Sequence, residues 1–138
     1  MGLDAIVYRN AANFSAIGDD YPFEVDQATG EIFSEGALSV PADRLVATRQ
    51  RLGNMDEVRF LRKEVQKQFG DAESILIQKV LYSATHSGDA IVVSDMALLR
   101  KELDVLRASN NVQLHSFIAA MNALIEASEG ERNPIVFA

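Results

Sequence analysis

Two short apolar runs and one alternation of apolar and acidic residues mark three stretches of the chain, and each of them predicts a β-strand or a hairpin. Residues 3–8, LDAIVY, place apolar side chains on both faces of a first strand. Residues 23–33, FEVDQATGEIF, alternate apolar residues with acids around a turn, where we expect Gly30 to take a positive φ. Residues 134–137, PIVF, predict a terminal strand that pairs with the first. The predicted sheet therefore combines the N-terminal strand, the hairpin and the C-terminal strand.

Helical spacing of apolar residues dominates the rest of the chain. Pro41 suits the first turn of a helix, which we expect to run to Leu52. Asn54 can then cap a second helix, with Glu57 three residues later completing a capping box. Gly70 is expected to end this second helix. Its apolar stripe consists of Met55, Val58, Leu61, Val65 and Phe69.

The second half of the chain predicts three more helical segments. Residues 73–83, ESILIQKVLYS, have almost no polar face, so a buried strand stays an alternative to the helix that we favour. Residues 89–93 predict a brief strand, after which Ser94 caps a helix that runs to Leu106. The clearest stripe predicts a core helix, with Leu114, Phe117, Ile118, Met121, Leu124 and Ile125 as its members. We therefore expect one α+β domain over residues 1–138, with about five helices packed on a small sheet.

Composition and charge narrow the function classes. The 138 residues are 48% hydrophobic and 24% charged, which is the composition of an ordinary globular domain. The chain has no cysteine, which excludes disulfides, thiolate metal sites and a cysteine nucleophile. Neither a signal-peptide pattern nor an apolar run near the ~20 residues of a membrane span occurs, so we expect a cytoplasmic protein. The formal net charge of −7 argues against nucleic acid or an anionic membrane as the partner.

Charge is unevenly placed along the chain, and this suggests a recognition surface. Between Arg9 and Arg44 there is no lysine or arginine, whereas acids accumulate. Two interpretations stay open: a solvated face, or an acidic surface that attracts a basic protein partner. The acids of the candidate surface are Asp19, Asp20, Glu24, Asp26, Glu31 and Glu35. The opposite charge recurs at helical spacing in Arg59, Lys63 and Lys67, a basic ridge that would suit an acidic partner.

Potentially reactive side chains are densest around Gly88. In a small hydrolase or transferase, His86 could act as general base and Asp89 as the carboxylate that orients it. An anionic group would then be bound by Arg62 or Lys63. The structural interpretation, which we favour, has His86 covering the last turn of a helix, Gly88 at a positive φ and Asp89 bonded to backbone amides. Neighbours in sequence seldom reach triad geometry, because base and nucleophile approach from different elements.

No metal or cofactor site is predicted. His86 and His115 are far apart in the sequence, and neither belongs to a His-x-x-x-His or carboxylate-rich motif. No glycine-rich loop carries the lysine of a phosphate-binding motif. We therefore expect neither a metal nor a cofactor.

Three short motifs occur together in this chain. It opens with Met1-Gly2-Leu3-Asp4 ahead of an apolar strand, it carries Glu57-Val58-x-x-Leu61-Arg62-Lys63, and Val93-Ser94-x-x-x-Leu98 begins a helix. With these motifs the chain resembles a group of small bacterial and phage proteins of unknown function that begin Met-Gly-Leu-Asp. The resemblance covers a minor part of the chain, and Phe60-Leu61 stands where a Tyr-Trp pair is expected. It implies a relationship of fold and no catalytic residue.

The leading expectation is a small acidic cytoplasmic binding protein that acts through protein–protein contacts. A toxin-neutralising immunity protein, or an accessory protein of a phage or a defence system, would be of this kind. Two alternatives stay open: the hydrolase or transferase based on His86 and Asp89, and a homo-oligomeric structural protein that associates through the Leu114–Ile125 stripe.

Overall fold

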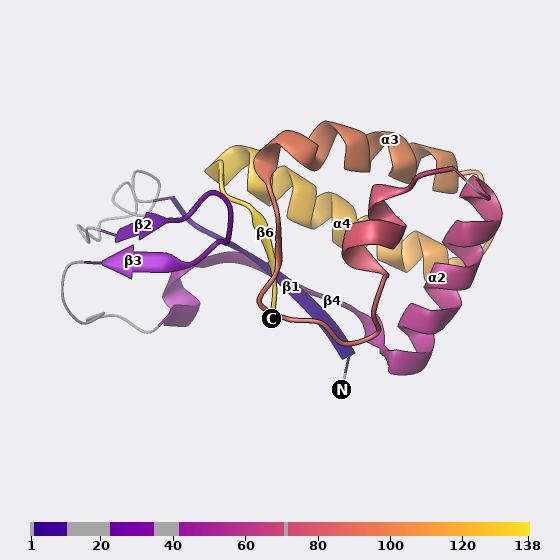
Figure 1. Cartoon of the computed structure of the whole chain (residues 1–138), viewed down its shortest axis with the longest axis horizontal. Coiled ribbons are helices and arrows are strands. Elements are labelled where there is room, and N and C mark those ends of the chain that lie inside the picture. The colour runs from indigo at the N-terminus through magenta and orange to yellow at the C-terminus, as the bar shows by residue number, and fades with distance from the viewer. Residues whose placement is uncertain (1, 11–22, 35–41, 71) are drawn as a thin grey trace.

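The chain folds into an antiparallel sheet with helices on one side and a separate hairpin at one end (Figure 1). The computed structural model describes residues 2–10, 23–34, 42–70 and 72–138. Its strands are β1 (Gly2–Tyr8), β2 (Phe23–Val25), β3 (Ile32–Ser34), β4 (Val46–Asn54), β5 (Ala90–Ile91) and β6 (Ile135–Phe137). Its helices are α2 (Met55–Phe69), the π-helical η2 (Leu76–Val80), α3 (Met96–Leu106) and α4 (Val112–Glu131), with 3-10 turns η1 (Ala42–Leu45) and η3 (Val93–Asp95). The α+β class is confirmed, whereas the described residues contain four helices and not about five.

The main sheet has the strand order β4-β1-β6-β5, and neighbouring strands are antiparallel. The predicted pairing of the two terminal strands is confirmed, because Ala5 lies opposite Phe137 and Ile6 lies opposite Val136. The predicted place of the hairpin is wrong, since β2 and β3 form a two-stranded sheet of their own. Three-residue strands offer few ladder bonds, and the nine-residue β4 takes the second side of β1 instead.

The helix predicted from Pro41 to Leu52 is wrong in its described part. Residues 42–45 form η1, and the strand β4 begins at Val46. Arg49 and Arg51 are both exposed and lie on one side of β4, which is the period of two expected for a strand. Pairing with β1 along almost its whole length stabilises this conformation, so a long-range contact overrides the local helix signals.

Helix α2 begins and ends as predicted. The Asn54 side chain accepts a hydrogen bond from the Glu57 N–H at 2.9 Å, and the Glu57 carboxylate accepts one from the Asn54 N–H at 3.1 Å. This reciprocal pair confirms the capping box. Gly70 follows the last turn with a φ of 57°. The buried residues of the helix are Val58, Leu61 and Val65.

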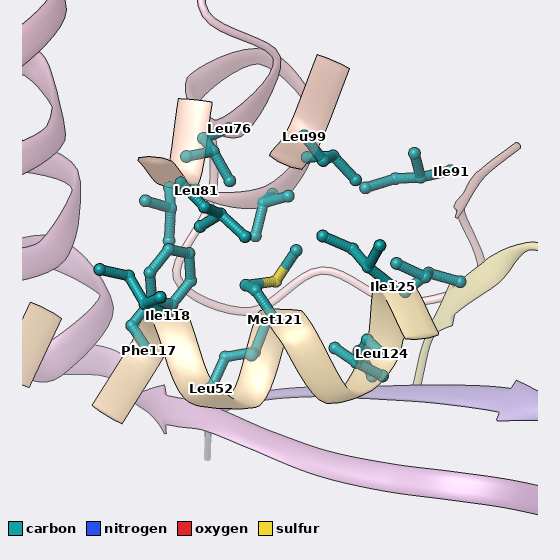
Figure 2. Close-up of a cluster of buried hydrophobic side chains, with 14 of the residues drawn as sticks. Leu52, Leu76, Leu81, Ile91, Leu99, Phe117, Ile118, Met121, Leu124 and Ile125 are labelled. Atoms are coloured by element: carbon teal, nitrogen blue, oxygen red, sulfur yellow. The ribbon is translucent and has the colours of Figure 1, made fainter. Parts of the chain in front are cut away.

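Helix α4 supplies the centre of the core, between the sheet and α3. Its predicted stripe is confirmed, since Leu114, Phe117, Ile118, Met121, Leu124 and Ile125 are all buried. Figure 2 shows Met121 and Ile125 of this stripe on the side of α4 that faces Leu81, Leu99 and Ile91. Each buried side chain of this size contributes about 1.5–3 kcal/mol, so the stripe anchors the fold. No helix in the described part of the chain is both long and apolar enough to cross a membrane.

The segment between α2 and β5 is less regular than predicted. Residues 73–83 are helical over η2 alone, where the Leu81 N–H bonds to the Leu76 carbonyl at 2.7 Å, the five-residue spacing of a π-helix. The helix favoured for this segment is therefore confirmed over a shorter range. The strand expected over residues 89–93 shortens to the two residues of β5, because the chain turns into η3 at Val93.

Ser94 is not the N-cap of α3, contrary to the prediction. It lies inside η3, and α3 begins at Met96 after Asp95, with no side-chain hydrogen bond at the cap. The Asp95 carboxylate instead pairs with Lys79 of η2 at 2.9 Å. An ion pair to a distant segment has replaced the local cap at this helix start.

Candidate functional site

The structure brings His86 and Asp89 together in the loop between η2 and β5. Nδ1 of His86 lies 2.8 Å from one Asp89 carboxylate oxygen, and the Tyr82 hydroxyl donates to the other at 2.6 Å. Nε2 of His86 lies 2.8 Å from the carbonyl oxygen of Val80, at the end of η2. Gly88 has a φ of 84°, which confirms the predicted left-handed turn and lets the loop fold back. A Tyr–Asp–His network forms within this one loop.

Both nitrogens of the His86 ring face oxygen atoms that can only accept. A backbone carbonyl has no proton to donate, and the Asp89 carboxylate has none while it is ionised. Both contacts are hydrogen bonds only when the ring carries two protons. Both ring nitrogens are therefore engaged within the fold, and the His86 side chain is only 7% exposed.

The electrostatics of the network follow from these contacts. Burial raises the pKa of Asp89, but the hydrogen bonds from His86 and Tyr82 outweigh it and hold that pKa below its ordinary value. The hydrogen bond to Asp89, together with burial, raises the pKa of Tyr82 to about 12. At neutral pH the carboxyl of Asp89 is therefore ionised and the hydroxyl of Tyr82 is protonated.

This loop is fastened to the C-terminal strand. The Gly88 N–H donates to the Phe137 carbonyl at 2.8 Å, and the Phe137 N–H donates to the Asp89 carbonyl at 2.9 Å. The ring of His86 contacts two aromatic rings, with centroids 4.3 Å from Tyr82 and 4.4 Å from Phe137. These contacts hold the loop against β6.

The arrangement suits a structural role better than a general base that awaits a substrate. Asp89 contacts Nδ1 of His86, and the other ring nitrogen, Nε2, contacts the backbone carbonyl of Val80. Of the two anion-binding candidates, Arg62 donates to the Tyr82 carbonyl at 3.2 Å, and Lys63 is exposed on α2. The structure therefore brings Arg62 to the same segment but uses it to hold the backbone.

The hairpin places part of the predicted acidic surface in solvent. Glu24 is exposed on β2 and lies directly opposite Phe33 of β3, which is 54% exposed. Glu31 is exposed next to the turn. On the other face Phe23 is buried and Val25 packs beside it, so the predicted alternation along β2 is confirmed. The outer hairpin face consists of Glu24, Glu31 and Phe33.

Asp26 differs from these acids, because its side chain is bonded within the turn. Its carboxylate accepts hydrogen bonds at 2.8 Å from the N–H groups of Thr29 and Ala28, which hold the pKa of Asp26 below its ordinary value. Asp26 therefore shapes the turn and contributes less to a contact surface. The remaining predicted acids, Asp19, Asp20 and Glu35, lie outside the described residues.

The turn of the hairpin is anchored to the main sheet. Gly30 has a φ of 74°, and a Cβ atom added there would lie 2.1 Å from Cγ2 of Val136. The Gln27 side-chain amide donates to the side-chain oxygen of Asn133 at 3.0 Å. The side-chain amide of Asn133 in turn donates to the backbone carbonyl of Tyr8 at 2.8 Å. Buried Asn133 thus joins the hairpin, β1 and the end of α4, a role that no sequence motif signals.

The basic ridge on α2 is exposed and partly paired within its own helix. Lys67 lies 2.9 Å from Glu64, and Arg59 lies 3.9 Å from Asp56. Lys63 is exposed between them. Exposed pairs of this kind contribute little free energy, so the ridge fits a solvated helix face.

Sequence reasoning missed a buried carboxylate at the start of η2. Glu102 of α3 is 6% exposed and accepts hydrogen bonds from the Ser74 hydroxyl at 2.6 Å and from the N–H groups of Ile75 and Leu76. Those N–H groups have no partner inside the helical turn, so Glu102 caps η2 from another element. An acid next to Leu103 on the buried side of α3 is the sequence signal that points to it.

Comparison with protein-family models, curated proteins and solved structures finds no match to this chain. The resemblance to small bacterial and phage proteins therefore stays a prediction. Among the described residues, no three His, Cys, Asp or Glu side chains are grouped so that they could hold a metal ion.

Proposed function

We propose that this protein binds another protein through its outer hairpin face, formed by Glu24, Glu31 and Phe33. The observation that carries the proposal is an exposed aromatic ring beside an exposed carboxylate: Phe33 is 54% exposed and lies directly opposite Glu24. Aromatic side chains supply much of the binding energy at interfaces, and the surrounding charges select the partner.

A basic protein with an apolar pocket is the partner that this face fits. The carboxylates would raise the association rate with a basic surface, and the ring of Phe33 would supply buried apolar area. The net charge of −7 would also raise the association rate with a basic protein. Neutralisation of a basic toxin by an immunity protein, or an accessory role in a phage or a cytoplasmic defence system, is binding of this kind.

The two alternative functions have less support. Both ring nitrogens of His86 are engaged within the fold, so an enzyme would have to open the loop before using them. The Leu114–Ile125 stripe is buried within a single chain, so it is not available as a contact between copies.

Capture from the lysate of the native host tests the hairpin as the contact. Immobilised parent protein is compared with the double variant Glu24→Lys plus Phe33→Ser at low and at high salt. We expect a basic protein that the parent retains at low salt to be released at high salt and to be lost by the double variant.

The matched control is Glu73→Lys, which makes the same charge change in the segment between α2 and η2. In Figure 1 that end of the molecule lies away from the hairpin. Glu73→Lys should capture the same protein as the parent. Equal capture by the parent and by the hairpin variant, insensitive to salt, would contradict the proposal.

A further inference from the structure

A second surface, opposite in charge to the hairpin, follows the outer edge of β4. This strand begins the order β4-β1-β6-β5 and has nine residues, whereas the other edge strand, β5, has two. No strand of the described residues pairs with the outer side of β4. A long edge strand presents unpaired N–H and C=O groups that another chain can use for pairing.

The register shows which backbone groups point outward. The N–H of Ala138, the residue after β6, donates to the Asp4 carbonyl at 3.0 Å. The backbone N–H and C=O of Asp4 therefore point toward β6. Successive residues of a strand direct their backbone N–H and C=O groups to opposite sides, so those of Ala5 point toward Gln50 of β4. The backbone groups of Arg49 and Arg51, on either side of Gln50, therefore face away from β1.

The same two arginines carry the charge of this edge. Arg51 lies opposite Asp4 and pairs with it at 3.1 Å, on the sheet face away from the helices. Arg49 lies opposite Ile6, so it has no carboxylate across the strand pair. Both arginines are exposed. An incoming strand with acids at alternate positions would meet both of them.

The helix-side face of β4 offers a pocket with a mixed polar and apolar lining at the same end of the strand, and Arg51, Glu57, Gln113 and Ser116 are its polar residues. Leu52 of β4, Leu61 of α2, and Val112 and Phe117 of α4 are among the residues that line this cavity of about 190 Å³. Val112 is 75% exposed, the highest value among the large hydrophobic side chains of the described residues. The pocket gives an apolar side chain of an added strand a place to pack.

We propose that an extended segment of another protein adds to the outer edge of β4 as a fifth strand. It would carry Asp or Glu opposite Arg49 and Arg51, and an apolar side chain would enter the pocket beside Leu52. Side chains of a strand alternate between its faces, so one acid–apolar alternation satisfies both faces at once. Fully overlapped antiparallel pairing of β4 with a second copy fits less well, because it would set Arg49 against Arg51. This surface is separate from the hairpin and does not depend on the function proposed for it.

The test uses a short fluorescent peptide that alternates glutamate with isoleucine, and a second peptide in which lysine replaces glutamate. Fluorescence anisotropy should show salt-sensitive binding of the glutamate peptide to the parent protein. Arg49→Glu should weaken that binding about tenfold or more and favour the lysine peptide, because the charge of the edge is reversed. The matched control, Arg59→Glu, makes the same charge change on the basic ridge and should leave the affinity unchanged.

Amide hydrogen exchange of the parent gives a second readout that needs no variant. Binding of the glutamate peptide should slow exchange at the N–H groups of Arg49 and Arg51 and leave that of Phe33 unchanged. The proposal is overturned if the parent does not bind the peptide, if Arg49→Glu binds it equally well, or if the slowed amides lie outside β4. A parent protein that is already a dimer, with slow exchange at Arg49 and Arg51 before peptide is added, would overturn it in favour of a second copy.

Discussion

The loop that carries His86 and the hairpin that carries Glu24 use their polar side chains in opposite ways. In the loop, His86, Asp89 and Tyr82 bond to one another and to the backbone. In the hairpin, Glu24 is in solvent beside an exposed aromatic ring. A dense set of reactive residue types is therefore not by itself a site. Polar atoms that find partners inside the fold contribute to stability, and recognition is left to atoms that the fold exposes.

The two regions nevertheless depend on the same strand. Gly30 of the hairpin turn packs on Val136 of β6, while the His86 ring contacts Phe137, the next residue. Successive side chains of a strand point to opposite faces of the sheet, so the hairpin and the loop hold β6 from opposite sides. Variants on each side can therefore be compared directly, beginning with those expected to change stability most.

Gly30→Ala should have the largest effect. The added Cβ would overlap the short, branched side chain of Val136, and the positive φ costs about 1–2 kcal/mol for any residue with a Cβ. Together these terms should lower the free energy of unfolding by about 2–4 kcal/mol, measured by urea denaturation. Gly88→Ala has a similar φ and open space around the new Cβ, so about 1–2 kcal/mol is expected.

A second substitution separates the two terms in the hairpin. In the double variant Gly30→Ala plus Val136→Ala, part of the loss should be recovered, because the steric overlap is removed while the φ strain stays. Equal losses for Gly30→Ala and Gly88→Ala would mean that Val136 does not restrain the turn.

His86→Ala should destabilise the protein by about 1–3 kcal/mol, because it leaves the Val80 carbonyl and part of the Asp89 carboxylate without donors. It also removes a ring from between Tyr82 and Phe137. The urea midpoint reports this loss. An unchanged midpoint, together with loss of a catalytic activity found in the parent, would support the enzyme alternative instead.

Acid should weaken the loop through Asp89. Its folded-state pKa lies below the ordinary value, so the unfolded chain binds more protons in acid, and its contribution is complete above the ordinary pKa. That contribution is lost as the pH falls from the ordinary pKa of an aspartate through the lower folded-state pKa of Asp89. Asp89→Asn should therefore flatten the fall of the free energy of unfolding in acid, measured by urea denaturation at a series of pH values.

Glu24→Lys should have the smallest effect on stability, within about 0.5 kcal/mol, because the side chain is exposed on the outer hairpin face. The same variant should slow association with a basic partner. A large loss of stability would show that Glu24 supports the fold, and the contrast between the loop and the hairpin would then fail.

Local patterns determined the helices and turns whose information lies within a few residues. The capping box of α2 and the stripe of α4 need only neighbouring turns, and Gly30 and Gly88 need only their own backbone conformation. Alternation along residues 23–25 likewise predicted that Glu24 faces solvent, on the side of β2 opposite Phe23 and Val25. These features can be predicted from the sequence because each is set by short-range geometry.

Tertiary structure alone decided the rest, because it depends on residues far apart in the chain. β4 is a strand because β1 pairs with it, and Glu102 is a cap because α3 brings it to the start of η2. The sequence did indicate that His86 and Asp89 are close, but the Val80 carbonyl and the Phe137 ring that engage His86 come from η2 and β6. The unpaired edge beside Arg49 also follows from the strand order, which the hydrophobic periodicity of the sequence does not predict. Long-range pairing determines which polar groups are satisfied, and so which surfaces are left to bind.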